Sequence, residues 1–129
     1  MSASKPVVVL VLRNPRRRQE LVMALRDGYE VHPFEDLQSA DKAPCWKKPS
    51  IVILPDMVGL GCHFDGMERA RMLMERREDP VPVILLGSLS ECPRSMVPFV
   101  NSMLLTYIGP HDYSAQFVVK VVNDRFPVT

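Results

Sequence analysis

The chain alternates short apolar runs with longer segments in which apolar residues recur at helical spacing. Continuous β-branched runs predict strands that are covered on both faces, as in a parallel sheet. A shorter alternating segment at Tyr29–Phe34 predicts a more exposed strand. The continuous runs that we interpret as strands are Val7–Leu12, Ile51–Leu54, Val81–Leu86 and Met103–Ile108.

The segments between these runs carry helix signals. Asn14-Pro15 supplies an N-cap and a first-turn proline, and Gly28 suits a helix end. Leu21, Ala24 and Leu25 are expected to form the apolar stripe of the first helix. The helices are predicted over about residues 16–26, 35–46, 65–77, 93–101 and 112–125.

Regular alternation of strands and helices predicts an α/β fold with a doubly wound parallel sheet. Five strands in 129 residues favour a single domain, residues 1–129, with the flavodoxin-like strand order 2-1-3-4-5. In that order, functional sites lie at the carboxyl ends of strands 1 and 3.

Composition narrows the class of protein. The chain is 47% hydrophobic and 24% charged, which is enough apolar material for a core, and a net charge of +1 offers no general attraction for nucleic acid or anionic membrane. Cys45, Cys62 and Cys92 contain no CxxC pair, which argues against a disulfide framework or a zinc site. No apolar run approaches the roughly 20 residues of a membrane helix. We therefore expect a cytoplasmic protein.

Three motifs follow one another along the chain: Pro49–Leu54 followed by Asp65-Gly66-Met67, then Pro82–Leu86, then Thr106–Pro110. In the order and spacing of these motifs, residues 6–126 resemble the response-regulator receiver (CheY-like) family. The resemblance implies a pocket at the strand ends in which acidic residues hold a divalent cation and an aspartate accepts a phosphoryl group. A hydroxyl and a lysine would bind the phosphoryl oxygens.

The expected chemical groups are missing from the corresponding positions. Leu12 and Arg13 replace the acidic pair, and leucine offers no oxygen ligand while arginine would repel a metal ion. Depending on the register, Pro55 or Met57 stands at the phosphoacceptor position, with Asp56 between them. A one-residue shift along a strand would direct the Asp56 side chain to the opposite face.

The remaining pocket positions differ as well. Gly87 takes the place of the hydroxyl residue, with Ser88 adjacent, and Gly109 replaces the lysine. Thr106 stands where many members have a switch aromatic. Together these changes predict a degenerate receiver without metal-dependent phosphorylation, without a cofactor and without catalytic residues. A divergent phosphoacceptor that uses Asp56 is the first alternative.

The resemblance also implies a partner surface. In the receiver family the fourth helix, the fifth strand and the fifth helix form the output and dimer face. Met96, Phe99, Val100 and Tyr107 lie on these segments, and any of them that is exposed would mark a contact with a partner protein or a second copy.

Other patterns carry weaker hypotheses. The loop with Gly59, Gly61 and Gly66 suits a small nucleotide-binding protein, but Phe64 stands where the third glycine of a dinucleotide motif belongs. Cys62-His63 alone does not make a metal site. The cluster Asn14–Arg18 would suit an acidic partner, a phosphate or nucleic acid, or would simply be solvated.

The leading hypothesis is an atypical receiver-like module of two-component-type signalling that binds protein and is not an enzyme. We expect either a stand-alone protein or the N-terminal module of a longer regulator. DNA binding by this domain is not expected, since no recognition-helix motif is present.

Overall fold

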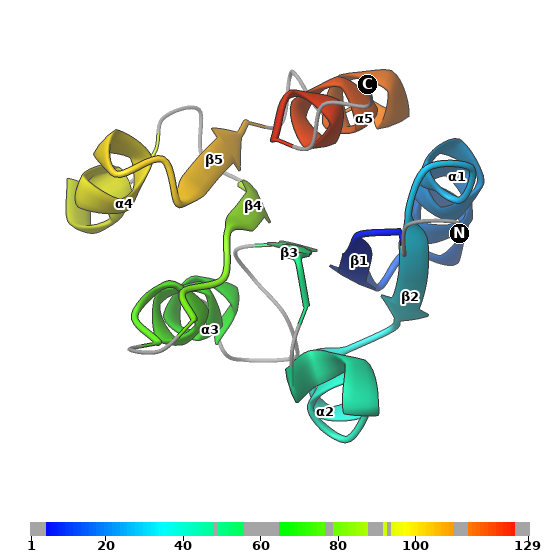
Figure 1. Ribbon diagram of the computed structural model, residues 1–129, viewed down its shortest axis with the longest axis horizontal. Helices are drawn as coiled ribbons and strands as arrows, with labels where there is room; N and C mark the ends of the chain where they lie inside the picture. The colour runs from blue at the N-terminus through cyan, green and yellow to red at the C-terminus, as the bar shows by residue number, and fades with distance from the viewer. Residues whose placement is uncertain are drawn as a thin grey trace.

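Five short apolar segments pair as parallel strands in one sheet. The computed structural model describes residues 5–47, 49–55, 65–76, 79–87, 92, 94–109 and 114–125. The strand order is β2-β1-β3-β4-β5, and all four pairings are parallel (Figure 1). The predicted flavodoxin-like fold is therefore confirmed. The strands are β1 (Val7–Val11), β2 (Glu30–Phe34), β3 (Ile51–Pro55), β4 (Val83–Leu86) and β5 (Leu105–Ile108).

Helices cover both faces of the sheet. Figure 1 shows α1 and α5 on one face, with α2, α3 and α4 on the other. This distribution follows from the parallel strands, because each crossover must return the chain over one face or the other. The helices are α1 (Pro15–Leu25), α2 (Leu37–Asp41), α3 (Asp65–Met74), α4 (Val97–Asn101) and α5 (Ala115–Arg125), and the 3-10 turns are η1 (Pro44–Lys47) and η2 (Arg94–Met96).

The sheet separates two apolar cores. Val8 and Leu10 pack with Leu21 and Leu25 of α1 on one face. Val9 and the other alternate strand residues pack toward α2, α3 and α4 on the opposite face. The interior residues of β1 and β3 have no exposed surface, and full burial of such a side chain contributes about 1.5–3 kcal/mol.

One detail of the predicted stripe of the first helix is wrong, and the last helix is also buried along a narrow line. Ala24 is exposed, so α1 buries only Leu21 and Leu25 of the expected three residues. Phe117 is 40% exposed, while Val118 and Val122 of the same helix are completely buried. In both helices the buried residues are spaced i, i+4, because neighbouring helices leave only a narrow seam against the sheet.

Among the described residues, no helix has the length and apolar character needed to cross a membrane.

The short helix α2 depends on an exposed cap. The Asp36 carboxylate accepts a hydrogen bond from the backbone N–H of Ser39 at 2.8 Å, while Leu37 and Ala40 bury the inner side of the helix. Hydrogen bonds from Ser39 lower the pKa of Asp36, and the positive charges of Arg13 and Lys42 add to this effect. The cap therefore works best when Asp36 is ionised.

We predict that α2 frays in acid. A carboxyl whose pKa is depressed by folding stabilises the native state above its unfolded pKa of about 3.9, and this contribution is lost as pH falls through the lower folded value. An NMR titration should give a depressed midpoint for Asp36, with amide exchange in α2 rising at the same pH. Asp36→Asn keeps a capping acceptor and should abolish the pH dependence. A midpoint at or above the ordinary value would contradict this view.

Candidate functional site

The carboxyl ends of the parallel strands meet at one edge of the sheet, where sites form in folds of this order. The described residues at this edge include Leu12, Pro55, Gly87 and Gly109. The candidate phosphoacceptor Asp56 lies outside the described residues, as do Met57, which stands at the acceptor position in one register, and Ser88. The glycine-rich loop with Gly59 and Gly61, and the pair Cys62-His63, also lie outside them, so these hypotheses stay predictions.

The turn between β1 and α1 is held by local hydrogen bonds. Asn14 is the N-cap of α1, and its Oδ1 accepts the backbone N–H groups of Arg16 at 3.0 Å and Arg17 at 3.2 Å. Pro15 occupies the first turn, where a missing N–H costs nothing. Leu12 is buried, and its N–H donates to the carbonyl of Phe34 at 3.0 Å. The predicted capping is confirmed.

A cation is fixed at the end of β1. The Arg18 guanidinium donates through Nη1 to the carbonyl oxygen of Leu12 at 2.7 Å and to that of Arg13 at 3.3 Å. A metal-binding turn would direct carboxylates to this point, and here a guanidinium binds the backbone of the turn instead. Arg13 itself is exposed and close enough to Asp36 to lower the pKa of that carboxyl. The described part of the turn therefore supplies positive charge and no acidic ligand.

The end of β4 is filled by an aromatic ring. Gly87 is buried, and a Cβ added there would overlap the Cζ, Cε2 and Oη atoms of Tyr107. Tyr107 lies opposite Leu85 in the parallel register. Gly87 follows Leu85 by two residues and therefore lies on the same face of the sheet, within reach of the Tyr107 ring. Any side chain at position 87 would have to displace it. The Tyr107 side chain, including its phenolic hydroxyl, thus occupies the space beside Gly87, where the resemblance to receivers implies a hydroxyl residue.

The ends of β3 and β5 are apolar or lack side chains. Pro55 is half-buried and lies opposite Leu86 of β4. Gly109 follows β5 and offers no charged group in place of a lysine. Thr106 is half-buried opposite Ile84. Among the described residues, no three His, Cys, Asp or Glu side chains come together to hold a metal ion.

The four residues that we predicted to bind a partner differ in how far they are exposed. Met96 is 1% exposed and belongs to the core under α4, so its assignment to a partner surface is wrong. It is buried because η2 turns it toward β4 and β5 before α4 begins. Phe99 and Tyr107 are half-buried against the same core, and Val100 is exposed.

Two exposed apolar residues beside Val100 were not predicted from the pattern. Val97 is 38% exposed, and Met103, which we expected to begin the fifth strand, is 70% exposed in the turn before β5. The absence of Asp, Glu, Lys and Arg between residues 95 and 109 is the sequence signal that could have identified this surface.

Met103 also has a conformation that side chains seldom adopt. Its φ is +66°, in the left-handed region that glycine favours. The turn is a Schellman motif, in which the N–H of Leu104 donates to the carbonyl of Phe99 and that of Met103 to Val100, both at 3.0 Å. A methionine at the glycine position of this motif costs about 1–2 kcal/mol.

Comparison with known proteins supports a fold assignment. No protein-family model matches the chain, and no curated protein sequence matches it. The response regulator DrrB of Thermotoga maritima, described as an OmpR/PhoB homolog, gives a TM-score of 0.75 at 18% identity over 95% of this chain and 52% of its own. This chain has the fold of a response-regulator receiver domain. It spans about half of that DrrB chain.

Two receiver-sized structures agree with this assignment. The beryllofluoride-activated DrrB receiver domain gives a TM-score of 0.72 at 18% identity, over 96% of this chain and 99% of its own. HP1043, an orphan response regulator of H. pylori, gives 0.69 at 13% identity, over 96% and 98%. At these identities the likeness to receiver domains is one of fold.

We predict that Gly87→Ala is destabilising. The new methyl group would push the Tyr107 ring out of its place, and overpacking of this kind costs about 1–3 kcal/mol. Gly28→Ala is the matched control, because no atom lies within 4 Å of a Cβ added there. That change should be neutral or stabilising by up to about 1 kcal/mol. Urea denaturation of both variants measures the difference.

A double-mutant comparison separates the contribution of the Tyr107 ring from other effects of Gly87→Ala. In a Tyr107→Leu background the cost of Gly87→Ala should fall, since the two sites interact only through the displaced side chain. Equal costs for Gly87→Ala and Gly28→Ala in the wild-type background would show that Tyr107 is not fixed over Gly87.

Proposed function

We propose that this single-domain chain is a receiver-like signalling module that acts without phosphorylation and binds protein. The observation that carries the proposal is the Tyr107 ring at Gly87, which occupies the place of the hydroxyl that would bind a phosphoryl oxygen. The basic end of β1 supports it, because Arg18 holds the turn that would otherwise carry the metal ligands. On this reading the protein is cytoplasmic and is not an enzyme.

Two other functions are alternatives to this proposal. A divergent phosphoacceptor would use Asp56, and would need a metal ion or an equivalent cation beside the phosphoryl group. A small nucleotide-binding protein would use the glycine-rich loop that begins at Gly59. We favour protein binding over both, because the described ends of β1, β3, β4 and β5 carry no acidic residue and no lysine, and position 87 itself carries no hydroxyl.

The first test is an amide NMR spectrum with and without Mg²⁺ and beryllofluoride, the compound named in the activated DrrB receiver structure. We expect no saturable shifts at millimolar concentrations, because the described ends of β1, β3, β4 and β5 supply no acidic ligand for the cation and the Tyr107 ring leaves no room at Gly87. Saturable shifts centred on Asp56, Ser88 and Thr106 would overturn the proposal and establish the phosphoacceptor. Adding a nucleotide in a separate titration tests the glycine-rich loop.

We further propose that the α4–β5 surface, defined here as Val97, Val100 and Met103 with Phe99 and Tyr107 beneath them, is the contact with a second copy. The exposed members are apolar, and depletion of charge is typical of an interface centre. In a symmetric dimer the same surface of both copies is in contact, and a surface without charged residues brings no like charges together there. A different protein partner on the same surface is the alternative.

Met103 gives this surface a sharp test. Met103→Gly removes the exposed side chain and relieves the left-handed strain, so stability should rise by about 0.5 kcal/mol after the extra flexibility of glycine is counted. If Met103 is buried between copies, its loss weakens self-association about tenfold. Sedimentation velocity measures association, and urea denaturation measures stability.

The controls for this experiment lie on other elements. Met23 on α1 and Met72 on α3 are 50% and 59% exposed, and their replacement by alanine should leave association unchanged. A protein that is monomeric at all accessible concentrations would exclude the second copy. The same Met103→Gly variant then tests binding of any candidate partner. If its stability has risen, misfolding is excluded as the cause of lost binding.

A further inference from the structure

A cavity of about 470 Å³ lies between the first turns of α1 and α5. Its size is in the range of small-molecule sites, which run from about 300 to 1,000 Å³. It is separate from the α4–β5 surface and lies on the opposite face of the sheet, where α1 and α5 pack together (Figure 1). The described residues that line it are Asn14, Arg16, Arg17, Glu20, Leu21, Ser114 and Ala115.

Two of the lining side chains are oriented as donors. The Oδ1 atom of Asn14 already accepts two backbone N–H groups of α1, so the NH₂ end of the amide is the group left to meet a ligand. Ser114 accepts the N–H of Phe117 at 3.1 Å, which leaves its O–H as a donor. The backbone N–H groups of Arg16 and Arg17 are engaged by Asn14 and do not contribute.

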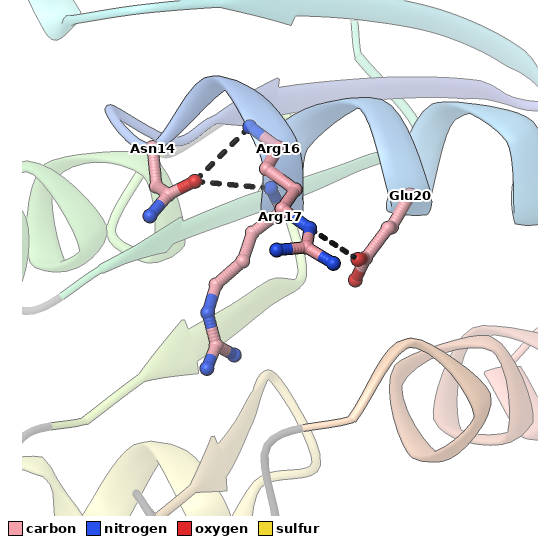
Figure 2. A network of polar contacts seen from close by, with 4 residues as sticks. All are labelled: Asn14, Arg16, Arg17 and Glu20. Atoms are coloured by element: carbon pink, nitrogen blue, oxygen red, sulfur yellow. Dashed lines mark hydrogen bonds and ion pairs between the residues drawn. The ribbon is translucent and has the colours of Figure 1, made fainter.

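The charges lining the cavity favour an anion. Figure 2 shows Arg16, Arg17 and Glu20 on the first turns of α1, with Arg16 Nε 3.8 Å from Glu20 Oε1. That contact is long, and both side chains are mostly solvated, so the Glu20 carboxylate only weakly offsets the Arg16 guanidinium. A guanidinium carries five N–H donors, and each arginine can bind an anion beside its internal contact.

The floor of the cavity is apolar. Leu21 is buried and Ala115 is half-buried, and both line the cavity beneath the charged rim. A ligand that fits has an anionic group for the arginines and an uncharged body for this floor. The first turn of α1 holds no acidic residue. The arginines there interact unfavourably with the helix dipole, which costs a few tenths of a kcal/mol each. A bound anion would offset that cost.

We propose that this α1–α5 cavity binds a phosphate group, most simply that of a small organic phosphate. The guanidinium groups of Arg16 and Arg17, with the Asn14 amide and the Ser114 hydroxyl, hold the phosphate oxygens, and Leu21 and Ala115 contact the organic body. The site does not depend on the proposed function, because it uses neither Asp56 nor the α4–β5 surface.

The test is an amide NMR titration of the full chain with inorganic phosphate, adenosine 5′-monophosphate and adenosine, at constant low ionic strength. Both phosphates should give saturable shifts at residues 14–20 and 114–117, and added salt should weaken them. Tighter binding of the nucleotide identifies an organic phosphate as the ligand, and equal binding identifies free phosphate. Equal shifts with adenosine would overturn the proposal.

Matched variants separate a site from general attraction. Arg17→Gln should weaken phosphate binding about fivefold, and Glu20→Gln should strengthen it by removing the opposing carboxylate. The pair formed by Arg71 of α3 and Glu75, which follows that helix, has the same i, i+4 spacing and the same 3.8 Å separation, so Arg71→Gln and Glu75→Gln are the controls. If Arg17→Gln weakens binding no more than Arg71→Gln, or if the titration never saturates, the cavity is not a phosphate site.

Discussion

Burial of both faces of the central strands is the constraint on which this structure depends. β1 and β3 expose none of their interior side chains, so helices must cover the sheet on each side. That requirement places α1 and α5 against one core and α2, α3 and α4 against the other. It also brings all parallel strand ends to one edge, so the properties of that edge follow from the few residues that end each strand.

Several described residues at that edge fit one another. Gly87 leaves a space at the end of β4, and the Tyr107 ring fills it from β5. At the end of β1, where carboxylates would need a metal ion to balance them, the Arg18 guanidinium bonds directly to the carbonyls of the turn. Both contacts satisfy packing or polar needs of the neighbouring residues.

The two surfaces proposed for binding differ in physical character. On the α4–β5 surface, exposed apolar side chains lie in a segment without charge, and Met103 has a left-handed backbone conformation that glycine favours. In the α1–α5 cavity, two arginines and two oriented donors stand over an apolar floor. The first favours contact with another protein surface, and the second favours a small anion, so one domain can serve both roles without overlap.

The order of apolar runs and helical segments was enough to predict the α/β class and the strand order, because a parallel sheet covered on both faces leaves few other arrangements. The Asn14 cap was also readable, since capping is a local interaction. The roles of Tyr107, Met96 and Met103 were not readable in this way. Whether an apolar residue fills the core, occupies the space beside Gly87 or faces solvent depends on register and on the rotation of short helices. Those are set by contacts between segments far apart in the sequence, and only the tertiary structure decides them.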